Sequence, residues 1–262
     1  LASIGNFADK IKILKLNRHL KKKSISAIFK TPETTTLTYL QKLGFSKAML
    51  QDFFKPFFSG IFLEPNLNTS SRMFEFVYKM FGNGFAALPK AGMQAISNQL
   101  KDGLKNTTIV LNSPVKEVKN KTVILQDGSE IESHFTIIAT EASHLVANLK
   151  NQETAWKSCD TLYFETSKRT LQRPIIGLIA DENALINNLF YPTSVATETK
   201  GAKELLSVTI VEDHNLTAEK LIEKVVEELH VFCGISNPKF IKHYQIKKGL
   251  PKKLTLGNLY AV

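Results

Sequence analysis

The chain has 262 residues, of which 43% are hydrophobic, and a formal net charge of +10. It is long enough to bury a substantial core, in one large domain or two smaller ones. No apolar run approaches the roughly 20 residues of a membrane span. Its two cysteines, Cys159 and Cys233, provide no disulfide framework, and its six histidines lack metal-ligand spacing. We therefore expect a cytoplasmic protein without a metal site.

The first thirty residues carry most of the excess positive charge. Asp9 is their only acid, against eight basic residues: Lys10, Lys12, Lys15, Arg18, Lys21, Lys22, Lys23 and Lys30. A solvated helix face is the simpler interpretation and the favoured one. The alternative is a basic surface for peripheral contact with an anionic membrane. We expect no nucleic acid as a partner, because no aromatic–basic interleaving or binding motif accompanies the charge.

The first ninety residues are predicted to be mostly helical. Apolar residues at three- and four-residue steps indicate an amphipathic helix over residues 3–22. Further helix starts are expected at Thr31-Pro32, at Ser46 and at 69–71, with ends at Gly44 and 82–84 and an end or a bend at Pro56. Phe57 and Phe58 belong to a phenylalanine-rich stretch. These rings either line a pocket for an apolar substrate or form ordinary core, and the sequence leaves both open.

A turn at residues 88–93 is expected to start a short amphipathic helix, followed by strands. The predicted strands are 108–111, Val115–Lys119, Thr122–Leu125 and, after a turn at Asp127-Gly128, a buried strand at 135–139. Beyond Thr140 we predict strands at 162–164, 175–180, 188–191, 205–211 and 240–246. A helix is expected between Thr217 and Gly234. The fold class is therefore α+β, with helices packed on a mixed sheet and an α/β segment around residues 106–145.

Three short motifs in this order carry a resemblance. Pro89-Lys90-Ala91-Gly92-Met93 opens a helix, Ser113-Pro114-Val115 enters a strand, and Ile137-Ile138-Ala139-Thr140 closes the unit. The pattern resembles the flavin-containing amine oxidoreductases, a superfamily of monoamine-oxidase-like, protoporphyrinogen-oxidase-like and phytoene-desaturase-like enzymes. The resemblance implies an FAD cofactor. It also implies an enzyme that oxidises a small apolar or cyclic substrate by hydride transfer to flavin.

The resemblance also implies a division of the chain. Residues 1–105 would be the helical part of a substrate domain, 106–145 the central segment of an FAD-binding domain, 146–246 the sheet and helix of the substrate domain, and 247–262 a return to the FAD-binding domain. The family's Gly-x-Gly-x-x-Gly fingerprint, whose glycines approach the pyrophosphate, and its C-terminal Gly-Asp do not occur in the chain. We therefore expect an internal piece of a longer enzyme that is inactive by itself.

Site residues are carried over from the resemblance position by position. It implies cofactor contacts at Val115, Ala139, Thr140, Gly249, Leu250 and Pro251, and a substrate pocket that includes Phe57, Phe58 and Tyr244. No catalytic residue is assigned. The family's amine oxidases have a lysine in one substrate-domain strand, and here Lys157 is predicted just outside that strand, which favours desaturase-like or porphyrinogen-like substrates. The alternative function is a non-catalytic module that binds lipid or a partner through the basic helix and a phenylalanine-rich pocket.

Overall fold

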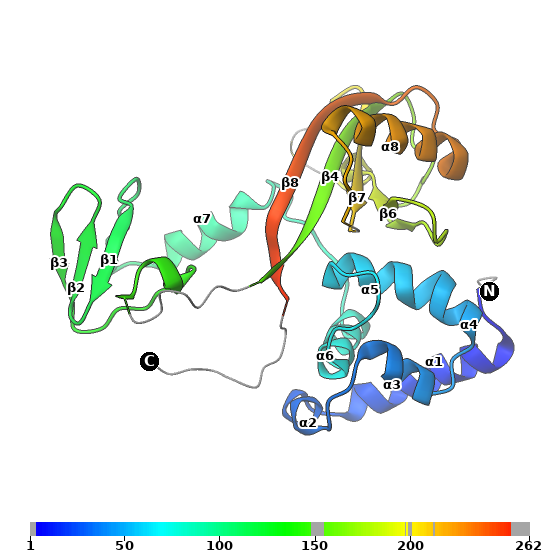
Figure 1. Ribbon diagram of the computed structural model, residues 1–262, viewed down its shortest axis with the longest axis horizontal. Helices are drawn as coiled ribbons and strands as arrows, with labels where there is room; N and C mark the ends of the chain where they lie inside the picture. Colours follow the sequence, from blue (N-terminus) through cyan, green and yellow to red (C-terminus); the bar gives the residue numbers. More distant parts are fainter. Residues whose placement is uncertain (1–3, 148–154, 197, 199–200, 212, 253–262) are drawn as a thin grey trace. The chain divides into compact units, whose positions relative to one another are not determined.

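The computed structural model describes residues 4–147, 155–196, 198, 201–211 and 213–252. These residues form two compact units. One unit combines residues 1–95 with 156–262 and contains a group of helices and a five-stranded sheet, and the other is Ile96–Ala155 with a three-stranded sheet (Figure 1). The predicted α+β fold class is confirmed. Of the helices in the described part of the chain, none has both the length and the apolar character needed to cross a membrane.

The predicted N-terminal helix is present as α1 (Phe7–Lys22). It begins with a capping box, in which the Asn6 side chain accepts from the Asp9 N–H and the Asp9 carboxylate accepts from the Asn6 N–H. The other helices of this group are α2 (Ile25–Lys30), α3 (Thr36–Lys42), α4 (Lys47–Met49), the π-helical turn η1 (Leu50–Phe54), α5 (Lys55–Phe62) and α6 (Ser71–Gly82). The expected caps at Ser46 and Ser70 are confirmed.

Of two predictions about proline in this group, one is wrong and the other is narrowed. Thr31-Pro32 does not start a helix, because Thr31 is the C-cap of α2 and the next helix begins only after the Thr35 cap. Pro56 does not end its helix. It lies just after the π-helical turn η1, and the helical path continues from Lys47 to Phe62, so a bend is the alternative that remains. The helix ends at Leu63, which has a left-handed backbone (φ +50°).

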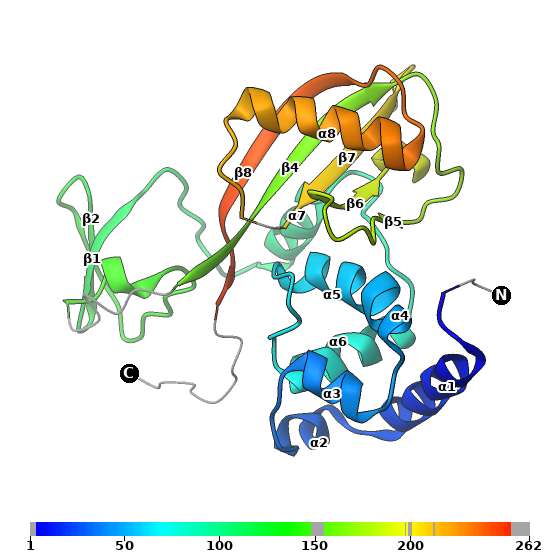
Figure 2. The same ribbon diagram turned by 45° about the vertical axis from the view of Figure 1, so that its right-hand side comes forward.

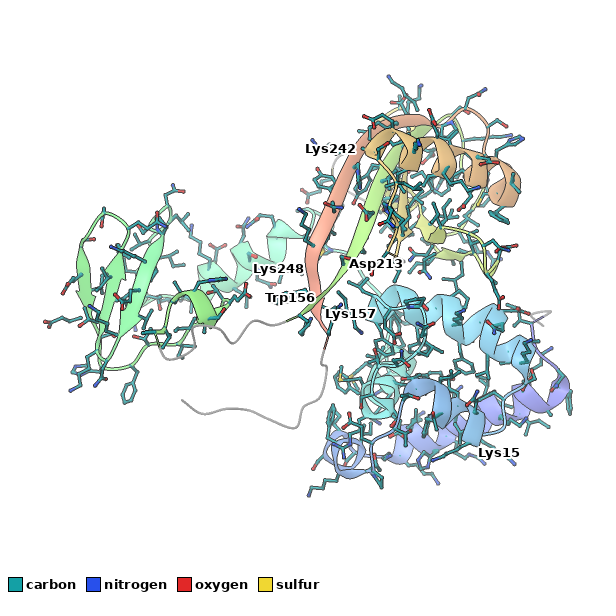
Figure 3. All side chains as sticks on the ribbon, viewed as in Figure 1. Lys15, Trp156, Lys157, Asp213, Lys242 and Lys248 are labelled. Carbon is teal, nitrogen blue, oxygen red and sulfur yellow. The ribbon has the colours of Figure 1, made fainter. Side chains whose placement is uncertain are left out.

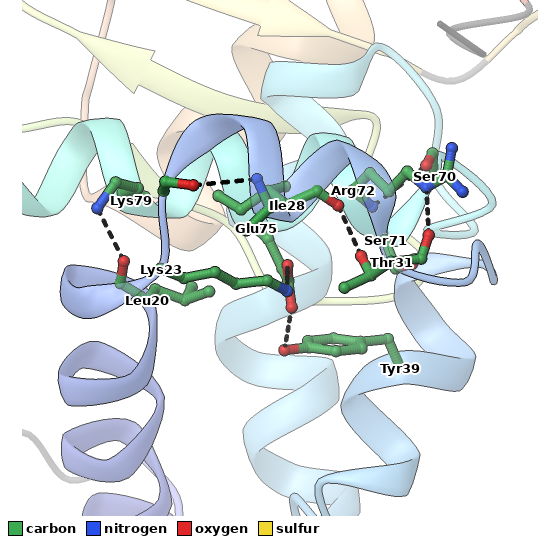
Figure 4. Close-up of polar contacts among 12 residues, drawn as sticks. Leu20, Lys23, Ile28, Thr31, Tyr39, Ser70, Ser71, Arg72, Glu75 and Lys79 are labelled. Atoms are coloured by element: carbon green, nitrogen blue, oxygen red, sulfur yellow. Dashed lines mark hydrogen bonds and ion pairs between the residues drawn. The ribbon is translucent and has the colours of Figure 1, made fainter. Parts of the chain in front are cut away.

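The helices enclose an aromatic core and a small polar network. Phe54, Phe58 and Phe74 are fully buried. Beside them the buried Glu75 carboxylate accepts hydrogen bonds from the Tyr39 hydroxyl, at 2.8 Å, and from the Lys23 ammonium, at 2.5 Å (Figure 4). Burial, together with this carboxylate, raises the pKa of Tyr39 far above its usual value. The network therefore satisfies a buried charge between α1, α3 and α6.

The sheet of this unit has the order β5-β6-β7-β4-β8. Its strands are β4 (Trp156–Thr166), β5 (Gly177–Leu178), β6 (Ile186–Phe190), β7 (Glu204–Ile210) and β8 (Lys239–Pro251), with a 3₁₀ turn at Pro192–Ser194. Every neighbouring pair is antiparallel, so the expectation of a mixed sheet is wrong. The strand expected at 175–180 is reduced to β5, and the strands expected at 162–164 and 240–246 are parts of longer ones.

The helix α8 (Ala218–Cys233) covers one face of this sheet (Figure 2). It begins at the Thr217 cap and ends at the left-handed Gly234, as predicted. Its buried Leu221, Val225 and Leu229 pack on inward-facing side chains of the strands. The Glu228 carboxylate accepts hydrogen bonds from the backbone N–H groups of Leu185 and Ile186, both at 3.0 Å, and so ties α8 to the start of β6.

The second unit contains most of α7 (Gln94–Gly103), then β1 (Val115–Lys119), β2 (Thr122–Leu125), β3 (Glu130–Glu132) and a 3₁₀ turn at Ala142–His144. The predicted helix, β1, β2 and the turn at Gly128 (φ +87°) are confirmed. Residues 108–111 form no strand, and the third strand is β3 rather than 135–139. Phe135 and Ile137 are 93% exposed, because no described strand lies beside them to pair with.

Candidate functional site

A cavity of about 910 Å³ lies between the helices and the first residues of β4. The loop joining α5 to α6 forms one wall, and the starts of α3 and β4 and the chain after β7 form the others. The residues that matter for its chemistry are Leu63, Glu64, Asn66, Thr69, Trp156, Lys157, Ser158 and Asp213. The cavity is therefore lined by both charged and apolar side chains.

Lys157 lines this cavity from the start of β4 (Figure 3). It is the second residue of β4, and its Nζ donates to the Phe62 carbonyl at 2.9 Å and to the Thr69 Oγ1 at 3.1 Å. Burial lowers the pKa of Lys157, and the nearby Glu64 carboxylate partly opposes that effect. An ammonium has three N–H donors, so one donor remains for a ligand or a water in the cavity.

The loop after α5 fixes the partners of this lysine. Glu64 Oε1 accepts from both the Thr69 N–H, at 2.9 Å, and the Thr69 hydroxyl, at 3.0 Å, while its Oε2 accepts from the Asn66 N–H at 2.9 Å. The Thr69 hydroxyl therefore donates to Glu64 and accepts from Lys157. This chain of hydrogen bonds leaves little freedom to the Lys157 ammonium, whose partners on the helices are 88 and 95 residues away in sequence.

Trp156 adds a second hydrogen-bond donor beside Lys157. Its indole N–H is buried and has no hydrogen-bond partner in the described structure. The Lys248 ammonium lies 5.9 Å from the centre of the Trp156 ring, a distance typical of a cation–π contact. A buried donor without a partner is unfavourable, so a ligand with an acceptor at this position would relieve that penalty.

This arrangement suits two chemical tasks. A lysine whose pKa is lowered by burial exchanges a proton more readily near neutral pH than a solvated lysine. The third N–H of Lys157 can also hold an acceptor atom of a bound molecule in one orientation. The described residues contain no group of three His, Cys, Asp or Glu side chains suited to a metal ion.

The predicted cofactor residues of β8 lie beside these donors. Leu250 pairs with Lys157 and Pro251 with Trp156 in the sheet, across an irregularity between Lys157 and Cys159. A methyl group at Gly249 would lie 2.5 Å from Leu63 Cδ1 and 3.2 Å from the Lys157 carbonyl oxygen. A residue without a side chain therefore fits position 249 best.

The predicted pocket residues are placed apart from the cavity. Phe58 is fully buried and packs against Phe54, Phe62 and Phe74 in the aromatic core, and its predicted role in a substrate pocket stays a prediction. Phe57 packs against the same cluster. Tyr244 is 53% exposed on β8, with its ring edge-on to that of Tyr163. None of the three lines the cavity around Lys157.

The remaining predicted cofactor residues belong to the second unit. Val115 begins β1 and pairs with Leu125. Ala139 and Thr140 are exposed and lie outside any strand, so the expected buried strand ending at Ala139 is wrong. Their predicted roles toward a cofactor stay predictions.

A second polar cluster lies on the same sheet and was not predicted. The buried Asp160 of β4 has its Oδ1 2.5 Å from His243 Nε2 of β8, and its Oδ2 3.4 Å from His214 Nε2 of the segment after β7. His214 Nδ1 accepts from the Leu216 N–H. The cluster joins three segments of the sheet around one carboxylate, and we assign it to stability.

Sequence reasoning missed the importance of Lys157. The prediction that it lies just outside its strand is wrong, because β4 already begins at Trp156, where the pairing with Pro251 starts. The argument against amine substrates that rested on a strand without lysine therefore loses its basis. The one available signal was a Trp-Lys pair at the start of an alternating strand pattern. Nothing local pointed to Thr69 or Glu64.

Comparison with protein families gives one match over most of the chain. The profile described as "Flavin containing amine oxidoreductase" matches residues 6–246. A comparison with curated protein sequences finds no match.

Solved structures with a similar fold are also found. An oxidoreductase from Methanosarcina mazei has a TM-score of 0.71 at 14% identity, covering 92% of this chain and 61% of that one. A reduced UDP-galactopyranose mutase has a TM-score of 0.61 at 11% identity, and the match covers 94% of this chain and 62% of the mutase chain. A candidate protoporphyrinogen oxidase from Exiguobacterium sp. 255-15 has a TM-score of 0.62 at 17% identity, and the match covers 95% of this chain and 62% of the oxidase chain. At these identities the likeness establishes the fold, and the chain spans about three fifths of each structure.

Proposed function

The chain belongs to the flavin-containing amine oxidoreductase family, and we propose that it forms the substrate-binding part and the central cofactor-binding segment of an FAD-dependent oxidoreductase. The observation that carries the proposal is the family match over residues 6–246, combined with a cavity lined by the hydrogen-bonded Lys157 and by Trp156, both at the start of β4. The reaction is the oxidation of a substrate C–H bond by hydride transfer.

The donors beside the cavity fit the polar edge of a flavin ring. Ring nitrogens and carbonyl oxygens of a flavin accept hydrogen bonds. Lys157 uses two of its three N–H groups on Phe62 and Thr69, and the Trp156 indole N–H has no partner among the described residues. When bound, FAD would accept the hydride and supply the redox chemistry. Trp156, Lys157 and the backbone of residues 249–251 would hold the ring. For the second unit we keep the cofactor contacts at Val115, Ala139 and Thr140 as a separate proposal that the family resemblance implies.

Within this proposal Lys157 is a positioning residue that also holds a proton. The Phe62 carbonyl and the Thr69 hydroxyl orient Nζ, and Glu64 orients Thr69. Because these two partners already hold Nζ, the third N–H of Lys157 is oriented for an acceptor atom of the substrate or cofactor before that molecule binds. Because burial lowers the pKa of Lys157, its neutral amine forms more readily than that of a solvated lysine. The lone pair of this amine could accept the proton that the substrate loses as its hydride is transferred.

The substrate we propose keeps the apolar or cyclic skeleton implied by the resemblance but carries a polar group. Leu63, Pro65 and Val211 offer apolar contacts, whereas Asn66 and Asp213 line the same cavity with polar atoms. A purely hydrocarbon substrate would leave these polar groups without partners, which is unfavourable. Substrates with a hydroxyl, amide, amine or carboxyl group on a ring system are therefore the first to test.

The cofactor is tested by titrating FAD into the protein produced from its whole gene. We expect one equivalent of FAD to bind, with a shifted visible spectrum and quenched flavin fluorescence. Trp156→Phe, which keeps an aromatic side chain but removes the indole N–H, should weaken binding or shift the flavin spectrum. The proposal fails if the purified wild-type protein neither retains nor binds FAD.

The role of Lys157 is tested by Lys157→Met and Lys157→Arg, with Lys203→Met as the matched control. Lys203 pairs with Glu165 on the protein surface and does not line the cavity. We expect Lys157→Met to slow anaerobic flavin reduction by about 100-fold and to flatten its pH profile, and Lys157→Arg to restore part of the rate. Equal rates and unchanged pH profiles in all three variants would remove Lys157 from the mechanism.

A further inference from the structure

The outer side of α1 carries an apolar ridge, which we define as Phe7, Ile11 and Leu14. These side chains are 78%, 39% and 67% exposed. Steps of four and three residues place them along one side of a helix. The buried residues of α1, namely Asp9, Leu16 and Leu20, lie on the opposite side and face the helical core. The ridge is thus not the core-facing stripe of α1 but a second apolar line that points to solvent.

Basic side chains border this ridge on both sides. At 100° per residue, Lys10 and Lys21 fall on one side of it, Lys15 and Lys22 on the other, and Arg18 continues its line. Lys15 is seen on the outside of α1 in Figure 3. None of these five side chains forms a hydrogen bond or ion pair within the described residues.

The remaining charges of the region are bound internally. Lys23 pairs with the buried Glu75, and Lys12 donates to the Gly44 carbonyl. Asp9, the only acid of the helix, is buried and accepts from the Ser46 N–H and hydroxyl. The outer side of α1 therefore has positive charge only.

The other long helix shows what an ordinary solvated face looks like in this protein. The exposed side of α8 alternates acids with lysines: Glu219, Lys220, Glu223, Lys224 and Glu227. Lys224 and Glu227 form an ion pair at 3.1 Å. The exposed side of α8, with charges of both signs and an ion pair between its own residues, is typical of a solvated helix face. The outer side of α1 differs, because it has an apolar ridge between lysines without ion-pair partners.

We propose that α1 is a docking helix for the surface of a membrane that contains anionic lipid. In this arrangement the helix lies in the plane of the interface, with Phe7, Ile11 and Leu14 among the upper acyl chains and the lysines at the level of the lipid phosphates. A second copy of the chain does not suit the ridge, because the same five positive charges would face each other. Nucleic acid does not suit it either, because phosphate contacts leave three apolar side chains in water.

The association is reversible and depends on salt. Three apolar side chains give only a small apolar contact, so most of the affinity comes from the basic residues. Each basic residue near the membrane surface raises the binding constant about fivefold. Raising the ionic strength from 0.1 M to 1 M shortens the screening length from about 10 Å to about 3 Å. Binding that is clear at low salt should therefore be lost at high salt.

The test is co-sedimentation of the protein with vesicles of phosphatidylcholine alone or with phosphatidylserine added. We expect binding only to the vesicles with phosphatidylserine. Lys15→Gln combined with Lys22→Gln should weaken it by roughly twentyfold, while Lys220→Gln combined with Lys224→Gln on α8 should not change it. Both pairs are exposed, so both double variants should keep the thermal midpoint of the parent protein.

The ridge is tested separately by Leu14→Trp and by Phe7→Ser combined with Leu14→Ser. The tryptophan emission should shift to shorter wavelength on phosphatidylserine vesicles, since the indole leaves water, and the serine variant should bind more weakly. The proposal is overturned if wild-type protein does not bind these vesicles, if the α8 pair weakens binding as much as the α1 pair, or if the ridge variants change only self-association or binding to an RNA homopolymer.

Discussion

The two compact units differ in how they bury apolar side chains. The helices and the five-stranded sheet have two clusters of buried hydrophobic residues, one around Phe54, Phe58 and Phe74 and one between α8 and the sheet. In the second unit, no described residue of 96–147 is buried. Its apolar side chains remain exposed, including Ile96, Leu100, Val110, Leu111, Phe135 and Ile137.

The two units are therefore stabilised by different kinds of contact. The first unit is held by contacts between residues far apart in sequence, which give it a core. In the second unit the described strands pair only with their neighbours in sequence, through tight turns such as that at Gly128. A small sheet with no buried face is marginal in water, so we expect the second unit to gain its stability from further contacts on its apolar side chains.

The largest expected effect comes from truncating one ring in each unit. Phe58→Ala should lower the free energy of unfolding by about 4 kcal/mol, because it leaves a cavity within a closed cluster of rings. Phe135→Ala, at a side chain 93% exposed, should change it by less than about 0.5 kcal/mol. Urea unfolding followed by circular dichroism measures both. Comparable losses would mean that Phe135 is buried in the protein in solution.

Removing the Glu228 carboxylate should be nearly as costly. Glu228→Ala leaves the N–H groups of Leu185 and Ile186 without acceptors, which should lower the free energy of unfolding by about 3 kcal/mol. Its neighbour Glu227 is exposed and pairs only with Lys224, so Glu227→Ala should stay within about 0.5 kcal/mol. The same unfolding curves compare the two, and a similar loss at both positions would refute a structural role for the Glu228 hydrogen bonds.

Asp9 should make the helical part sensitive to acid. Burial favours a higher pKa for Asp9, but hydrogen bonds from Ser46 and Asn6 and the charge of Lys12 outweigh it, so the pKa lies below the usual 3.8. A carboxyl with a lowered pKa stabilises the fold above its unfolded-state pKa, and this stabilisation is lost as the pH falls through the folded-state pKa.

Asp9→Asn should therefore lower the free energy of unfolding at pH 7 by about 2 kcal/mol and flatten its decline below about pH 4. Asp102→Asn, at an exposed position of α7, serves as the control. Unfolding measured from pH 7 down to pH 2.5 decides the matter. If Asp9→Asn loses stability at low pH as steeply as the parent protein, other carboxylates cause the acid sensitivity.

The smallest effect concerns the packing of two glycines. Gly249→Ala brings a methyl group within 3.2 Å of the Lys157 carbonyl and against Leu63, which can partly move aside, so we expect a loss of about 1 kcal/mol. Gly103 has no atom within 4 Å of an added Cβ, and Gly103→Ala should be neutral or slightly stabilising because alanine favours the helix. Thermal midpoints of the two variants give the comparison, and a stabilised Gly249→Ala would contradict the close contact.

Local signals predicted most helix ends and the hairpin. Ser46, Ser70 and Thr217 cap their helices as expected, and Gly234 ends α8, since each acts on residues within one turn. The strand expected at 135–139 failed because an apolar run becomes a strand only beside a partner. The site around Lys157 was not predictable for a related reason, since its hydrogen-bond partners lie 88 and 95 residues away.

The central claim is that the cavity around Lys157 lies beside a bound flavin. Its most direct test is anaerobic reduction of the FAD-loaded protein by candidate ring substrates with a polar group, followed at the flavin absorbance in wild type and Lys157→Met. We predict that both bind FAD and that only the wild type is reduced rapidly by at least one substrate. A wild-type protein that binds no FAD, or a Lys157→Met variant that is reduced at the wild-type rate, would contradict the account.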